Sequence, residues 1–192
     1  MQSLQVIKSE YTTENIEKMF HKYARGRGKA KNKENLPEIQ RAVFYCPLWI
    51  MTVKAEFKRL FLGKYRLVTG VAVDGWTRQA GSIGAMPGCD ETSVPDDNIL
   101  AAGCSREEAE EQALLFLQDA LTLKHRSVPE LEIRNVHLVY QPIFLGKYLN
   151  KQGKSLYILV DGVSGRQIFR YENVMDKIAA MVPAVKEVLT DI

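Results

Sequence analysis

The sequence predicts an α+β fold made of two pseudo-repeats, each a helix followed by a three-stranded antiparallel meander, with a further helix at the C-terminus. Helix-type and strand-type hydrophobic periods follow one another in the same order in both halves of the 192-residue chain. Three short motifs also recur in both halves, in the same order. A stretch rich in glycine, proline and aspartate, residues 80–104, separates the halves and predicts a long connection.

The first half begins with a helix and continues with strands. TTENIEKMFHKYA can be capped by Thr12 or Thr13 and carries apolar residues at helical spacing. RGRGKAKNK, residues 25–33, has five basic residues, two glycines and no acid, which is typical of an exposed loop. The run from Arg41 to Phe57 is rich in aromatic and β-branched residues and predicts a long strand. KYRLVTGVAV predicts a second strand, and WTRQAGSI predicts a third strand after an Asp-Gly turn.

The second half repeats this order behind a better-marked helix. Ser105 and Glu108 predict a capping box, in which each side chain satisfies a backbone N–H of the first turn. Strands are expected in LEIRNVHLVYQPIFLGKYL, in KSLYILV and, after a second Asp-Gly turn, in RQIFRYE. A final helix begins near Glu172, and Pro183 is expected to kink it or to split it in two.

Short motifs set the register of the duplication. LPEI at 36–39 resembles VPEL at 128–131, YCPLW at 45–49 resembles YQPIF at 140–144, and VDG occurs at 73–75 and 160–162. The pentapeptide FLGKY also occurs twice, at 61–65 and 144–148, but aligning its copies matches little upstream of them. In the preferred register the first copy lies near a hairpin tip and the second on a strand. We therefore expect repeats at 1–85 and 105–192, a connecting loop at 86–104, and one compact body.

The second half resembles a PepSY-type unit, which is a helix followed by a short antiparallel meander. The resemblance is carried by SREEAEEQALLFL and by LYILVDGVSGRQIF, in which Val160, Asp161, Ser164 and Gly165 match the pattern V-D-x-x-[ST]-G. In the first half, VDGWTR lacks the closing glycine. The resemblance implies a module without catalytic activity that interacts with proteins or modulates them.

Cysteine usage and hydropathy indicate a cytoplasmic protein. Cys46, Cys89 and Cys104 are odd in number and form no CxxC pair, so a reducing compartment is expected. The N-terminal segment has no continuous apolar stretch that would indicate a signal peptide. No apolar run approaches the roughly 20 residues that a membrane-spanning helix needs.

The sequence indicates no catalytic residue, no cofactor site and no metal site, and we expect a protein that is not an enzyme. Asp74 and Asp161 recur, but Asp-Gly is standard turn chemistry. The acids in 90–97 do not have the spacing of a calcium loop. The histidines lack metal-site spacing; they are His21, His125 and His137. A catalytic set assembled in space by the fold stays open at this point.

One basic surface is the candidate binding site. It combines the loop 25–33 with the hairpin 54–66, where aromatic residues alternate with cations, an arrangement that can follow a phosphate backbone and stack on bases. A net charge of +3 is too small to indicate nucleic acid by itself. We expect protein or peptide binding, with accessory nucleic-acid binding as the alternative, and the sequence leaves a homodimer open. The candidate residues are Arg25, Arg27, Lys29, Lys31, Lys33, Lys58, Arg59, Phe61, Lys64, Tyr65 and Arg66.

Overall fold

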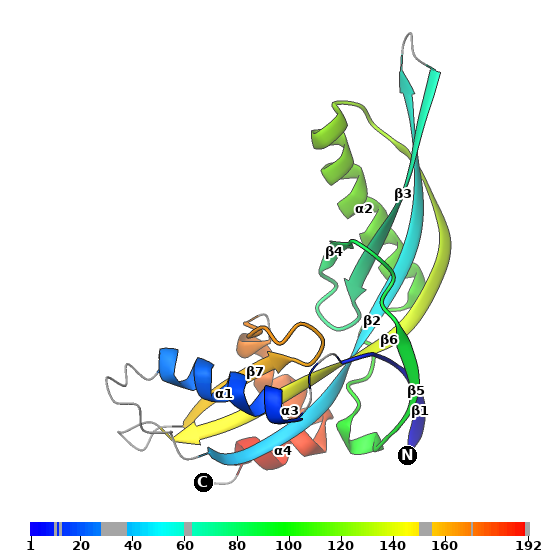
Figure 1. The fold of residues 1–192 in the computed structure, drawn as a ribbon. Helices are drawn as coiled ribbons and strands as arrows, with labels where there is room; N and C mark the ends of the chain where they lie inside the picture. Colours follow the sequence, from blue (N-terminus) through cyan, green and yellow to red (C-terminus); the bar gives the residue numbers. More distant parts are fainter. Residues whose placement is uncertain are drawn as a thin grey trace. The chain divides into compact units, whose positions relative to one another are not determined.

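The computed structural model describes residues 1–9, 11, 13–27, 38–59, 63–149, 155–169 and 171–190, with the backbone alone at 13, 24–27, 38, 39, 59 and 172. Figure 1 shows its helices and strands. They are β1 (Gln2–Ile7), α1 (Thr13–Arg27), β2 (Glu38–Arg59), β3 (Gly63–Asp74), β4 (Ala80–Ile83), β5 (Cys89–Val94), the 3-10 turn η1 (Asp96–Asn98), α2 (Arg106–His125), β6 (Glu130–Leu149), β7 (Ser155–Asp161), the 3-10 turn η2 (Glu172–Val174), α3 (Met175–Met181) and α4 (Pro183–Thr190).

The strands pair into a mixed, largely antiparallel sheet. Within the described residues seven strands take part in the order β4-β3-β2-β6-β1-β5, and β7 pairs with β6. The parallel pair joins β1 to β6, with Val6 opposite Tyr140. The α+β class predicted from the sequence is therefore confirmed, whereas the strand order by itself does not display two separate meanders.

The chain divides into two compact units, and each is assembled from segments that are distant in sequence. Unit 1 comprises Met1–Cys46, Cys89–Leu100 and Tyr140–Ile192, and unit 2 comprises Pro47–Gly88 and Ala101–Val139. The long strands β2 and β6 each contribute their first part to one unit and their last part to the other.

In unit 2, helix α2 covers one face of the hairpin formed by β2 and β3 (Figure 1). Side chains alternate between the two faces of a strand, so the buried apolar residues of β2 recur at every second position from Met51 to Phe57. Two small residues of α2, Ala109 and Ala113, are buried in one cluster with apolar residues of this hairpin. The predicted capping box is confirmed: Ser105 Oγ accepts from the Glu108 backbone N–H (3.2 Å), and Glu108 accepts from the Ser105 N–H (2.8 Å).

In unit 1, helix α1 packs on β6 and β7. Its buried residues Ile16 and Phe20 join Tyr148, Ile158 and Val160 in one apolar cluster. A second cluster forms where β1 meets β5 and β6; it contains Leu4, Val6 and Val94 with the half-buried Tyr45, Ile99 and Tyr140. The C-terminal helix is split as expected: α3 ends before Val182, whose backbone is extended, and α4 begins at Pro183.

Several predicted elements need correction. Residues 86–104 are not only a connecting loop, because they contain β5 and η1. RQIFRYE is not a strand: within the described residues it forms a single bridge, from Val160 to Gln167. Strand β1 was not predicted. The basic segment does not begin as a loop at Arg25, because α1 continues to Arg27; its remainder, residues 28–33, lies outside the described residues.

None of the helices in the described part of the chain is both long enough and apolar enough to cross a bilayer.

Candidate binding site

The two Asp-Gly turns are tied to the long strands in the same way. In unit 2 the Gly75 N–H donates to the carbonyl of Pro47, and in unit 1 the Gly162 N–H donates to the carbonyl of Pro142, both at 2.9 Å. In each turn an added Cβ would press on that proline, at 3.0 Å from Pro47 Cβ and at 2.9 Å from Pro142 O. The motifs Y-x-P and V-D-G thus form one structural contact in each unit.

The aspartates of these turns accept hydrogen bonds from the backbone. Asp74 Oδ1 accepts from the backbone N–H groups of Trp76 and Thr77, at 2.9 and 2.8 Å. Asp161 Oδ1 accepts from the Val163 N–H at 2.8 Å. Both carboxylates therefore cap a turn, which agrees with the structural interpretation of the sequence.

Both turns close through a residue in the left-handed region. Gly165 has φ +64° and Arg78 has φ +63°, and each N–H donates to the carbonyl of the turn aspartate at 2.8 Å. Glycine adopts this conformation without strain, and other residues adopt it at a cost of about 1–2 kcal/mol. The first half thus makes the same turn with Arg78 in place of the glycine, and the Arg78 side chain pairs with Glu108 at 3.1 Å.

Carboxylates pair with the cations of the predicted basic hairpin. Glu56 on β2 binds both Lys64 and Arg66 on β3. Further pairs join β2 to β6: Lys58 with Glu130 at 2.5 Å, and Lys54 with Glu132 at 3.6 Å. These side chains lie at alternate positions of adjacent strands and form a ladder of opposite charges on one face of the unit 2 sheet.

Glu56 is the most enclosed member of this ladder, with 8% of its surface exposed. Hydrogen bonds from Lys64 and then Arg66 lower the pKa of its carboxyl from 4.5 to about 2, against the opposing effect of burial. The carboxylate is therefore charged at neutral pH and anchors two of the hairpin's cations.

Phe57 and Tyr65 of the hairpin lie on the opposite sheet face from Lys58, Lys64 and Arg66. Phe57 is buried against α2, and its ring centroid lies 4.6 Å from that of His125 and 5.9 Å from that of Tyr65. Lys58 and Lys64, by contrast, belong to the charged ladder. These rings and these cations therefore face opposite ways, whereas the side chains of Arg59 and Phe61 lie outside the described residues.

The predicted basic surface is only partly described. Lys58, Lys64, Tyr65 and Arg66 are placed with their side chains in unit 2, while the described part of the basic segment, residues 25–27 at the end of α1, belongs to unit 1. For Arg25, Arg27 and Arg59 the backbone alone is described, and Lys29, Lys31, Lys33 and Phe61 lie outside the described residues.

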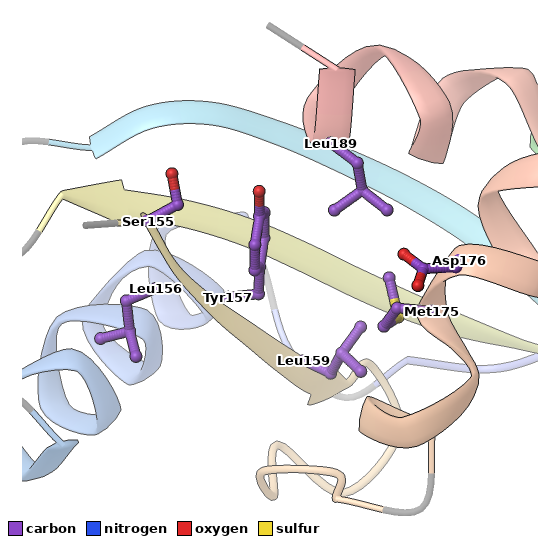
Figure 2. A pocket seen from close by; sticks show the side chains of 7 residues that line it. All are labelled: Ser155, Leu156, Tyr157, Leu159, Met175, Asp176 and Leu189. Atoms are coloured by element: carbon purple, nitrogen blue, oxygen red, sulfur yellow. The ribbon is translucent and has the colours of Figure 1, made fainter. Parts of the chain in front are cut away.

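A pocket in unit 1, which sequence reasoning missed, lies between β7 and the helices α3 and α4 (Figure 2). Its volume is about 370 Å³. Leu159, Met175 and Leu189 supply apolar walls, and the other lining residues are Ser155, Leu156, Tyr157 and Asp176. In Figure 2 the hydroxyl groups of Ser155 and Tyr157 are directed to the same side of β7, and the Asp176 carboxylate extends toward them from α3.

Two oxygen acceptors of this pocket are without a partner in the described part of the chain. Ser155 Oγ is buried and makes no hydrogen bond there. Asp176 has no hydrogen bond or ion pair there. Buried polar groups are normally satisfied, so Ser155 Oγ favours a ligand that hydrogen-bonds to it, and the solvent-exposed Asp176 carboxylate adds a negative charge at the same pocket.

A buried cation lies beside this pocket. Lys147 on β6 is opposite Tyr157 on β7, so its side chain lies on the same sheet face, where 1% of its surface is exposed. Its signal in the sequence is a lysine inside the otherwise apolar strand segment PIFLGKYL. A buried ammonium is costly unless it is paired, so Lys147 is part of the local polar structure of unit 1.

The described residues contain no group of three or more His, Cys, Asp or Glu side chains placed to hold a metal ion. Comparison with protein-family models, curated proteins and solved structures finds no match to the chain.

Proposed function

We propose that the protein is a binding module without catalytic activity, and that it holds a side chain of a peptide or protein partner in the pocket between β7, α3 and α4. The observation that carries this proposal is the combination of apolar walls with the buried, unpartnered Ser155 Oγ and the solvent-exposed carboxylate of Asp176. A volume of about 370 Å³ suits one long side chain rather than a large cofactor.

The chemistry of the lining favours a basic side chain. Lysine and arginine bury an aliphatic stem along apolar surface while their charged ends donate hydrogen bonds. Leu159 and Met175 suit the stem, and Asp176 suits the cation. Lys147 is the competing feature, because its ammonium would instead favour an anionic ligand.

Titration with short peptides tests this function. Blocked pentapeptides of alanine with arginine, lysine, norleucine or glutamate at the centre are added to protein labelled with ¹³C at the methyl groups of its six methionines. Saturable shifts of the Met175 methyl are expected in the order arginine and lysine, then norleucine, then glutamate. The proposal fails if no peptide shifts this signal.

A charge-neutral substitution isolates the contribution of the carboxylate. Asp176→Asn is expected to weaken binding of the arginine peptide about tenfold while leaving the norleucine peptide unchanged. Asp119→Asn, at an exposed acid of α2 in unit 2, is the matched control and should change neither. Tighter binding of the glutamate peptide would assign the pocket to an anionic ligand instead.

The competing function is nucleic-acid binding by residues 25–33 and the hairpin 54–66. Pairing of the hairpin cations with Glu56, Glu130 and Glu132 counts against it, because paired cations release fewer counterions on binding a phosphate backbone. Oligonucleotide titrations at two salt concentrations decide the matter. A steep salt dependence that is lost in the Lys29/Lys31/Lys33→Ala variant would favour nucleic acid.

We also propose that the chain consists of two related repeats, at 1–85 and 105–192, of which the second is PepSY-like. The matched hydrogen bonds of Gly75 to Pro47 and Gly162 to Pro142 support this. Superposition of the two turns in an experimental structure tests it: Pro47 should fall on Pro142 and Asp74 on Asp161. A module of this kind in a reducing compartment such as the cytoplasm agrees with the three free cysteines.

A further inference from the structure

Helix α1 and the hairpin it covers come from different halves of the sequence. Phe20 of α1 lies with its ring centroid 6.1 Å from that of Tyr148 on β6. Farther along the helix, Tyr23 donates its hydroxyl to the carbonyl of Gly165, in the turn that follows β7. The first-half helix is therefore packed on the second-half hairpin and its turn.

Helix α2 shows the converse arrangement. Its buried residues Ala113 and Leu117 share a cluster with Val53 on β2 and Val71 on β3. Near its N-terminus, Glu108 pairs with Arg78 in the turn that follows β3. The second-half helix is therefore packed on the first-half hairpin and its turn.

The segment that precedes each helix also pairs with a strand of the other half. Ahead of α1, Val6 forms a parallel bridge with Tyr140 of the second half. Ahead of α2, Ile99 forms a parallel bridge with Tyr45 of the first half, and the Leu100 N–H donates to the Tyr45 carbonyl at 3.0 Å. The two tyrosines occupy matching positions of the motifs YCPLW and YQPIF.

The last residues before each helix also bind the turn of the other half. Ser9 donates its hydroxyl to the carbonyl of Gly162. Gly103 donates its N–H to the carbonyl of Gly75 at 2.8 Å. Four kinds of contact, namely strand bridge, pre-helix bond, helix packing and turn bond, thus connect the halves reciprocally.

We infer that the two repeats exchange their leading segments and helices, so that each hairpin is a docking surface whose occupant is the helix of the other repeat. The inference rests on the repeat proposed above and adds the partner of each hairpin. Such reciprocal exchange between like elements is the arrangement of a swapped homodimer, here held within one chain. Neither unit can then form from one half of the sequence.

Double-mutant cycles in the full-length chain test the exchange. Phe20→Leu with Tyr148→Leu is expected to show a coupling of about 2- to 10-fold in the unfolding equilibrium constant, as contacting rings do. Phe20→Leu with Val71→Ala pairs residues of the same sequence half that lie in different clusters, and it should show no coupling. Coupling in the second cycle without coupling in the first would overturn the inference.

Nuclear Overhauser effects in the unmutated chain serve if a variant fails to fold. Cross-peaks are expected between the Phe20 ring and the Tyr148 ring, and between Leu117 and Val71 methyl groups. Cross-peaks from Phe20 to Val71 in their place would refute the exchange. If the expected cross-peaks appear but the two turns do not superpose, the repeat proposal is wrong, and the inferred exchange between repeats is wrong as well. The peptide titrations test the pocket independently of both.

Discussion

Alanine at Gly162 places a methyl group where the second Asp-Gly turn meets the long strand. Its Cβ would lie 2.7 Å from Phe144 Cε2, 2.9 Å from Pro142 O and 3.0 Å from Pro142 Cγ. The same carbonyl accepts the Gly162 N–H at 2.9 Å, so the strand cannot withdraw from the methyl without weakening that hydrogen bond.

The expected cost is the balance of two terms. Inserting a methyl into a packed site costs about 1–3 kcal/mol. Replacing glycine by alanine also restricts the unfolded chain, which stabilises the fold by about 0.4–1 kcal/mol. Gly162→Ala should therefore lower the free energy of unfolding by about 1–2 kcal/mol, which corresponds to roughly 2–8 °C in Tm for a chain of this size.

Alanine variants at two other glycines serve as comparisons for Gly162→Ala. At Gly75 the added Cβ would meet Pro47 atoms at 3.0, 3.1 and 3.1 Å, so a smaller loss is expected. At Gly84 it would meet nothing within 4 Å, so Gly84→Ala should be neutral or slightly stabilising. Urea unfolding can be monitored by far-ultraviolet circular dichroism. The urea midpoint should be highest for Gly84→Ala, lower for Gly75→Ala and lowest for Gly162→Ala. Equal midpoints for Gly162→Ala and Gly84→Ala would refute the steric reasoning.

Substitutions at three further positions probe the charged ladder, the helix cap and the turn. Because Lys64 and Arg66 lower the pKa of Glu56 from 4.5 to about 2, its charged form stabilises the fold above pH 4.5, and this contribution is lost as the pH falls from 4.5 to 2. Glu56→Gln should thus flatten the fall of the urea midpoint in that window, and an unchanged pH profile would contradict the pairing. Ser105→Ala removes the capping box and should cost about 1 kcal/mol in urea unfolding; no loss would mean that the cap is not formed in solution. Asp161→Ala should cost about 1–2 kcal/mol, and Asp161→Asn, which keeps an acceptor, should cost less; equal losses would show that the hydrogen bond to the turn is not the cause.

Elements with a strong local signal could be predicted from the sequence. The capping pair Ser105 and Glu108 marks the start of α2, and Pro183 marks the break between α3 and α4. Strands β1 and β5 have no such signal, because QSLQVI and CDETSV are short and partly polar. They stabilise each other by antiparallel pairing from Gln2 opposite Val94 to Ile7 opposite Cys89, a contact between residues far apart in sequence.

The candidate site could not be predicted either, because it also depends on contacts between residues far apart in sequence. The pocket combines Ser155 and Tyr157 of a strand with Asp176 and Leu189 of two later helices, and their convergence depends on tertiary packing. The basic hairpin could be recognised from its composition, but the pairing of its cations depends on acidic residues elsewhere in the chain. Glu130 and Glu132, which pair with its lysines, lie on β6, more than seventy positions along the chain.

The repeated pentapeptide FLGKY shows why register matters more than identical letters. In the first copy, Lys64 and Tyr65 follow the hairpin turn on β3, where Lys64 is largely exposed and 40% of Tyr65 is exposed. In the second copy, Lys147 and Tyr148 lie within β6 and are buried, at 1% and 0% exposed. The same residues therefore have different neighbours, different solvation and different roles. Gly75 and Gly162 are instead matched by hydrogen bonding, so alanine is expected to destabilise the fold at both positions, and more at Gly162 because its Cβ would lie closer to its neighbours.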